Sequence, residues 1–194
     1  MRWPVFAFFA FVFVVAQMSL RNVLTLETLG FVTPDIVACL AVFVTLFAHR
    51  TSALWACWTL GLAMDLAPQL TREGGHVIGP NALGYVFGGY MVLQLRTMVF
   101  RRRAVTLGFL TLVFVLAASV VAVALLTVRG WYAAENPMAA GPLVEFMRRS
   151  GVALYSGIIA MPLGWLLGGT IWLWGFQSGM SRRTGSWAAM SDRG

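Results

Sequence analysis

Charged residues are scarce in this sequence of 194 residues, of which only 11% are Asp, Glu, Lys or Arg and 59% are hydrophobic. A water-soluble domain of this size needs far more polar surface than these residues supply. The composition therefore excludes a soluble globular protein and indicates an integral membrane protein.

Histidine and cysteine are also scarce, with two residues of each type. They do not stand at the spacing of a metal site, so we expect no metal and no cofactor. Cys39 and Cys57 both fall within apolar runs, at depths that differ by about 7 Å when counted from the turn between the runs. We expect two buried free thiols rather than a disulfide.

The motifs of common enzymes are missing as well. We find no Ser-His-Asp set, Cys-His pair or phosphate-binding glycine loop. Asp35 and Asp65 stand at the edges of apolar runs, where a charge is costly. The residues before Asp65 do not match the Gly-x-Gly-Asp pattern of intramembrane aspartyl proteases. We predict no enzymatic activity, with an intramembrane hydrolase that uses both aspartates as the alternative.

Long uncharged runs are what the sequence does contain. A helix needs about 20 apolar residues to cross a bilayer, and runs that are apolar on every face are not barrel strands. We predict an all-α integral membrane protein in one domain, a bundle of six transmembrane helices. The expected spans are residues 4–20, 31–48, 52–67, 79–95, 104–128 and 151–176, followed by a flexible cytoplasmic tail at 177–194.

The net charge of +7 has no soluble module to present it to nucleic acid, so we expect no nucleic-acid partner. If the N-terminus is cytoplasmic, nine arginines lie inside and five outside, and six of the seven acids lie outside or at the outer edge. The positive-inside rule then places both termini in the cytoplasm. The first 20 residues lack a clear signal-peptide cleavage site, so we expect a retained first span.

The two aspartates have different local settings. Thr33, Pro34 and Asp35 resemble a helix start with a Thr cap, a proline at the first position and an acid in the first turn. His49 and Arg50 mark a tight hairpin between the second and third spans. Counted from this hairpin, both aspartates are expected at a depth of about 22 Å, near the outer face and within reach of each other.

Asp65 is expected at the C-terminal end of its helix, where the macrodipole disfavours a negative charge. It therefore needs a partner. The candidates are the backbone amides that open the second or fourth span, the side chain of Asn81, or Arg72. We favour a hydrogen-bonded structural clamp over a site that acts on a substrate or a proton.

Glycines four residues apart occur in the fourth span (Gly84 and Gly88) and in the sixth (Gly164 and Gly168). They are candidate faces for helix packing or for a partner helix. We further expect Arg96 to Arg103 to anchor the inner side, residues 142–149 to form a short surface helix, and Pro162 to kink the last span.

The order of features from Thr33 to Leu95 resembles the MreD family of rod shape-determining proteins. The residues that carry this resemblance are Pro34, His49, Arg50, Gly61, Asp65, Gly79, Ala82, Leu83 and Tyr90, with Tyr155 and Pro162 in the final span. Two departures are a longer loop after Asp65 and Ser156, which stands where Asn is frequent.

The resemblance implies a non-enzymatic, multi-pass subunit of the bacterial cytoplasmic membrane that scaffolds or regulates lateral peptidoglycan synthesis and cell shape. The implied partners are MreC and, through it, MreB, RodA and the elongation penicillin-binding transpeptidase, together with membrane lipid. The family is also similar in fold to the substrate-binding subunits of energy-coupling-factor transporters. A vitamin-binding subunit of that type is therefore the alternative, although Ala7, Ala10 and Ala16 lack the spacing of its docking face.

The residues and the resemblance together suggest a mechanism. We expect the hairpin of spans two and three, clamped by Asp65, to hold a groove against the fourth span beside Gly84 and Gly88. A partner's membrane helix would bind in that groove.

Overall fold

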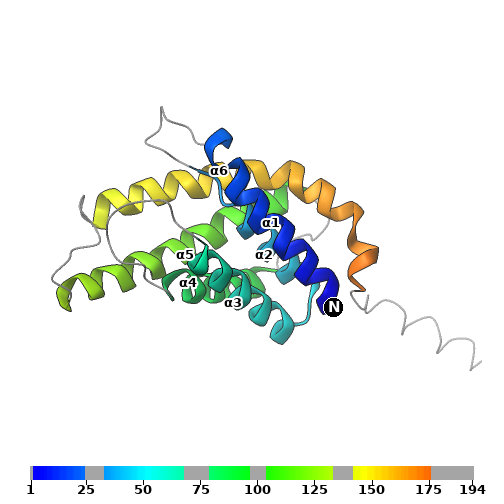
Figure 1. Cartoon of the computed structure of the whole chain (residues 1–194), viewed down its shortest axis with the longest axis horizontal. Coiled ribbons are helices and arrows are strands. Elements are labelled where there is room, and N and C mark those ends of the chain that lie inside the picture. Colours follow the sequence, from blue (N-terminus) through cyan, green and yellow to red (C-terminus); the bar gives the residue numbers. More distant parts are fainter. Residues whose placement is uncertain (1, 25–32, 68–78, 97–103, 133–141, 176–194) are drawn as a thin grey trace, which may run out of the picture.

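The computed structural model describes residues 2–24, 33–67, 79–96, 104–132 and 142–175. Within these ranges the chain forms six α-helices, one 3₁₀ helix and no strand (Figure 1). The elements are α1 (Trp3–Leu24), α2 (Ile36–Phe47), α3 (Arg50–Leu66), α4 (Pro80–Leu95), α5 (Ala104–Tyr132), α6 (Pro142–Gly169) and the 3₁₀ helix η2 (Ile171–Trp174). The prediction of an all-helical chain is thus confirmed for the described residues.

Three of the described helices are long and apolar enough to cross a membrane. The crossing segments are Trp3–Leu20 of α1, Val105–Val128 of α5 and Phe146–Gly169 of α6. These three helices support the membrane location that the composition predicts.

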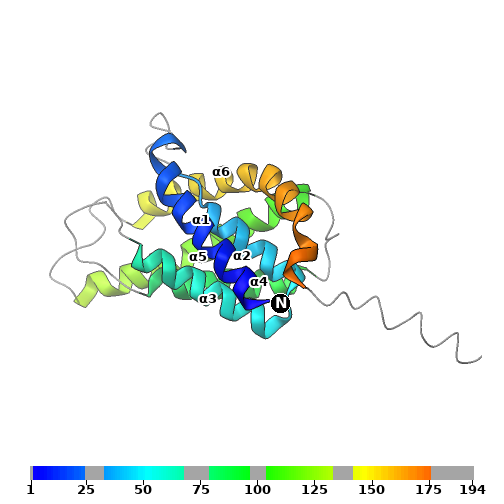
Figure 2. The same cartoon turned by 45° about the vertical axis from the view of Figure 1, so that its right-hand side comes forward.

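Helix α2 forms the centre of the bundle. Every residue from Ile36 to Leu46 is buried, and α2 packs against α1, α3, α4, α5 and α6. Both views show the other helices around it (Figure 2). With 12 residues, α2 is only about 18 Å long, shorter than the roughly 30 Å hydrocarbon core of a bilayer.

Glycines determine the closest approach between α4 and α5. A Cβ atom added to Gly84 would lie 2.8 Å from the carbonyl oxygen of Ala118, and one added to Gly88 would lie 2.9 Å from that of Phe114. Real side chains do not fit at such distances, so these helices need glycine there. Helix α5 fills the Gly84–Gly88 face, and the predicted groove for a partner helix beside it is wrong.

The sixth span departs from the prediction at its start. Helix α6 begins at Pro142, nine residues before the expected position, and residues 142–149 belong to it instead of forming a separate surface helix. The helix runs without a break through residues 148–151, where the uncharged run of the sequence begins, and the hydroxyl of Ser150 donates to the carbonyl oxygen of Phe146 at 2.9 Å. Pro162 lies inside α6, which curves in its orange half (Figure 1).

The two ends of the described fold meet. The N–H of Arg2 donates to the carbonyl oxygen of Trp174 at 3.1 Å. The Trp174 ring is fully buried, stacks on Phe9 with ring centres 4.9 Å apart, and contacts Phe43 edge-on at 5.5 Å. Helix η2 thereby fastens the end of α6 to the start of α1 and to the central helix.

Candidate functional site

The Asp65 carboxylate closes the joint between α3 and α4. Its Oδ2 accepts hydrogen bonds from the backbone N–H groups of Gly79 and Ala82, both at 3.0 Å, and its Oδ1 accepts from that of Asn81 at 3.3 Å. The side chain is 1% exposed. Asp65 therefore caps the first turn of α4, where free N–H groups and the helix dipole favour a negative charge.

This geometry selects one of the candidate partners of Asp65. The backbone amides that open the fourth helix hold the carboxylate, and Asn81 contributes its backbone N–H. Arg72 lies outside the described residues. The unfavourable position of Asp65 at the end of α3 is offset because the start of α4 presents the opposite dipole.

Two glycines allow α3 and α4 to come this close. Gly79 adopts φ 125°, a backbone conformation that residues with a side chain rarely adopt. A Cβ on Gly61 would lie 2.7 Å from the Cα of Ala82 and 2.8 Å from the carbonyl oxygen of Asn81. Four of the residues that carry the family resemblance, Gly61, Asp65, Gly79 and Ala82, thus build this joint.

Asp35 is the N-cap residue of α2, and its Oδ1 accepts from the backbone N–H of Ala38 at 2.9 Å. The prediction that Thr33 caps the helix and Pro34 begins it is wrong, since α2 starts at Ile36. The aspartate is the stronger cap because its oxygen reaches the third amide of the helix. Its second oxygen, Oδ2, accepts a short hydrogen bond from the hydroxyl of Tyr85 in α4.

The two aspartates therefore meet through α4. Asp65 binds the backbone of its first turn and Asp35 binds Tyr85 one turn later. The prediction that the two aspartates come within reach of each other fits these contacts, and the bridge between them is the first two turns of α4.

Side chains from α1 and α6 complete the start of α2. The Gln17 amide donates to the carbonyl oxygen of Pro34 at 2.8 Å and accepts from the N–H of Ile36 at 2.7 Å. The Ser156 hydroxyl accepts from the N–H of Asp35 at 2.7 Å and donates to the carbonyl oxygen of Val152 at 2.7 Å. Together with Tyr85 of α4, these side chains come from three helices that surround the start of α2.

These contacts have a physical reason in a membrane. Ser156 lies near the middle of α6, which is long and apolar enough to cross, so the non-helical residues Thr33, Pro34 and Asp35 lie deep in the bundle. Backbone outside a helix is tolerated at such depth only where protein groups satisfy it. Gln17 and Ser156 do so, and Pro34 has no N–H to satisfy.

The opposite end of α2 is held by a cation. Nη1 of Arg96, the C-cap residue of α4, donates to the carbonyl oxygens of Thr45 at 3.1 Å and Ala48 at 2.9 Å. These are carbonyls of the last turn, which no intrahelical amide satisfies, at the negative end of the helix dipole. Arg96 is the described residue of the segment from Arg96 to Arg103 that was expected to anchor the inner side, and residues 97–103 lie outside the described ranges.

The remaining predicted residues take varied positions. His49 precedes α3 and its Nδ1 lies 3.2 Å from the Thr51 hydroxyl, at the tight turn expected between α2 and α3. Gly164 packs against Leu107, whereas a Cβ added to Gly168 would meet no described atom of another helix within 4 Å. Arg50, Tyr90 and Pro162 are exposed, and Tyr155 is half-buried. Cys39 and Cys57 are buried free thiols, as predicted.

Sequence reasoning missed Gln17, Tyr85 and the hydrogen-bonding role of Ser156. A signal existed for Gln17, because an amide inside an otherwise apolar first span requires a partner. Tyr85 had no signal of its own, because tyrosine is common in membrane helices. Gly108 and Gly157 were missed too: a Cβ on Gly108 would lie 2.7 Å from the carbonyl oxygen of Gly157, yet neither glycine belongs to a four-residue pair.

The buried polar groups of this site form hydrogen bonds with one another. In the described part of the chain, every buried side-chain nitrogen and oxygen has a hydrogen-bond partner, and no three His, Cys, Asp or Glu residues gather as metal ligands. The arrangement fixes the ends of α2 and α4 and joins α1, α3 and α6 to them. Comparison of the chain with protein-family models, with curated proteins and with solved structures finds no match.

Proposed function

We propose that this protein is a non-enzymatic membrane subunit of the bacterial rod complex, similar to MreD, which scaffolds lateral peptidoglycan synthesis. The observation that carries the proposal is the joint between α3 and α4. Gly61, Asp65, Gly79 and Ala82, four of the residues on which the family resemblance rests, contact one another there. These residues hold two helices together, as is expected of a scaffold protein.

The proposal includes six crossings of the cytoplasmic membrane with both termini inside. The contact of Arg2 with Trp174 supports it, because the start of α1 and the end of α6 then lie on one side. The Asp65 contact joins the end of α3 to the start of α4. The Arg96 contact joins the end of α4 to the end of α2. With 12, 17 and 16 residues, helices α2 to α4 measure about 18 to 26 Å, which is less than the roughly 30 Å hydrocarbon core.

The partner surface of this scaffold is the outside of α1 and α6. Phe8 and Phe11 of α1 and Ile158 and Trp165 of α6 are each more than 60% exposed. Helix α5 already covers the glycines of α4, so these outer faces are the places where a membrane helix of MreC would pack. MreC would then connect the protein to MreB, RodA and the elongation penicillin-binding transpeptidase.

Affinity purification from native membranes tests this proposal. The tagged full chain should recover MreC, with RodA and the transpeptidase at lower yield, and an unrelated multi-pass bait expressed at the same level should not. Recovery of transporter ATPase subunits with tight, saturable vitamin binding, and without MreC, would instead establish the transporter alternative.

A further inference from the structure

Several helix ends meet at one end of the bundle, which we call the η2 end. The N–H of Arg2 donates to the carbonyl oxygen of Trp174, and the Trp174 ring contacts Phe43 near the end of α2. The turn at His49 joins α2 to α3. The start of α1, the end of α2, the start of α3 and η2 therefore lie together, as both views show for the blue, cyan and orange segments (Figures 1 and 2).

Four tryptophans are exposed at the η2 end. Trp3 begins α1, Trp55 and Trp58 lie on α3, and Trp172 lies in η2. Their exposed fractions range from 40% to 79%. Trp55 and Trp58 contact each other edge-on, with ring centres 5.7 Å apart. These four residues form a tryptophan belt that three separate elements contribute.

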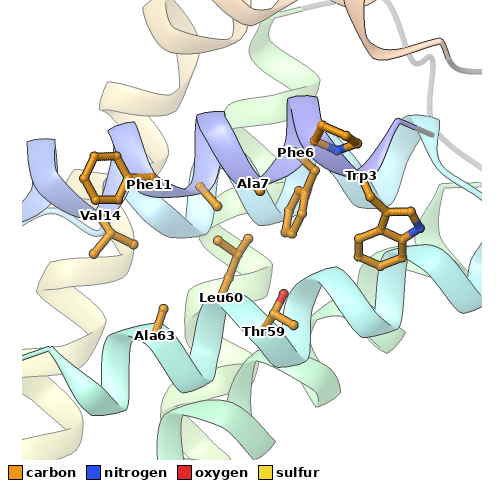
Figure 3. Close-up of a pocket in the computed structure, with 10 residues that line it drawn as sticks. Trp3, Phe6, Ala7, Phe11, Val14, Thr59, Leu60 and Ala63 are labelled. Carbon is orange, nitrogen blue, oxygen red and sulfur yellow. The ribbon is translucent and has the colours of Figure 1, made fainter.

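The belt residues of α1 and α3 lie at a similar level. Trp3 and Thr59 line the same hollow between the two helices, and Trp3 lies on the side of Thr59 that faces the start of α3 (Figure 3). Trp58 directly precedes Thr59, and Trp55 lies about one turn earlier on that same side. Farther along α1 the exposed large side chains are Phe and Val, such as Phe11. The outer surface thus changes from indoles to wholly apolar side chains.

An indole suits the boundary between hydrocarbon and water. Its ring is apolar but its N–H needs an acceptor, so tryptophan gathers at the level of lipid headgroups. Two exposed arginines accompany the belt, since Arg2 directly precedes α1 and Arg50 begins α3. The acids of the described ranges, Asp35, Asp65 and Glu145, lie at other helix ends. The described part of the η2 end therefore carries positive charge, which complements anionic lipid phosphates.

We infer that the tryptophan belt binds the headgroup region of one membrane leaflet, with its indole N–H groups donating to lipid ester and phosphate oxygens. The belt extends over three elements instead of following one helix face, so it fits a continuous lipid layer better than a single partner helix. The inference depends on the membrane location of the protein and not on a role in the rod complex.

Fluorine NMR of the full chain in lipid nanodiscs tests the depth of the belt. The protein carries 5-fluorotryptophan, and each resonance is assigned from its loss in a single Trp→Phe variant. The nanodiscs contain phosphatidylethanolamine and phosphatidylglycerol, with either gadolinium chelated at a lipid headgroup or a nitroxide near the end of an acyl chain. The measured quantity is the ratio of line broadening by the headgroup probe to line broadening by the acyl-chain probe.

Helix α1 provides a matched control. Phe11→Trp adds an exposed indole on the same helix as Trp3, about 12 Å farther along. We expect the broadening ratio of the four belt indoles to be severalfold higher than that of the introduced indole. Equal ratios would overturn the proposal. Belt resonances that neither lipid probe broadens would place this end of the protein in water and would overturn it too.

A photoreactive side chain distinguishes lipid from a protein partner. Benzoylphenylalanine replaces Trp55 in the full chain expressed in cells, and mass spectrometry identifies the products of illumination. We expect phospholipid adducts. A crosslinked protein as the main product would overturn the proposal.

Discussion

Two charged residues stabilise helix ends of opposite polarity. The Asp65 carboxylate lies at the positive N-terminal end of α4 and the Arg96 guanidinium at the negative C-terminal end of α2. In both cases the charge binds backbone groups that a helix end leaves free. In an apolar environment an unsatisfied backbone group costs several kcal/mol, so these contacts determine where the central helices begin and end.

Replacing Asp65 should separate its hydrogen-bonding role from its charge. Asp65→Leu removes the cap of α4 and should lower the free energy of unfolding by about 1 to 2 kcal/mol, whereas Asp65→Asn keeps an acceptor oxygen and should lose less. Thermal unfolding in detergent measures both. Equal losses in the two variants would show that the amides of α4 are not the main partner of Asp65.

Arg96 should matter more than the exposed Arg50 at the start of α3. Arg96→Met keeps the bulk but leaves the carbonyls of Thr45 and Ala48 without this donor, at a cost of about 1.5 to 3 kcal/mol. Local opening of α2 should then rise roughly 10- to 100-fold, and alkylation of the buried Cys39 and Cys57 with it. Arg50→Met should not change that rate; a similar increase in both variants would refute the capping role.

At the scale of elements, close backbone contact joins α4 to α5. Gly88→Leu must push α5 away, because even a Cβ at Gly88 would lie 2.9 Å from the carbonyl oxygen of Phe114. We expect a loss of at least about 1 to 3 kcal/mol in stability. Gly168→Leu, on an open part of α6, serves as the control and should be nearly neutral. Size-exclusion and thermal unfolding of both proteins make the comparison.

The helices could largely be predicted from the sequence, and their contacts only in part. Uncharged runs reveal helices because a bilayer imposes length and polarity, and the range expected for α4 agrees with the structure to within one residue. The start of α6 was misplaced because the uncharged run begins only after Arg148 and Arg149, whereas the helix includes both arginines. The helix dipole alone indicated that Asp65 needs a partner. The contacts of Gln17 with Pro34 and of Ser156 with Asp35 depend on long-range packing, which the local sequence pattern does not encode.

At the scale of the molecule, the proposed topology predicts which surfaces water-soluble reagents reach. Cysteines introduced at His49, in the turn between α2 and α3, and at Leu66, near the end of α3, replace exposed residues. In whole cells an impermeant maleimide should label Leu66→Cys, and His49→Cys should react only after the cells are opened. The reverse pattern would invert the topology, and labelling of both from outside would rule out a crossing by α3.

The central claim is that Asp35 and Asp65 act as acceptors within a scaffold and perform no chemistry. Cells depleted of the protein and supplied with the Asp35→Asn, Asp65→Asn double variant provide the most direct measurement, because asparagine retains an acceptor oxygen but not an ionisable group. The account predicts that the variant assembles with MreC and restores rod-shaped growth. A variant that assembles normally but leaves the cells round would contradict it and assign the aspartates a catalytic role.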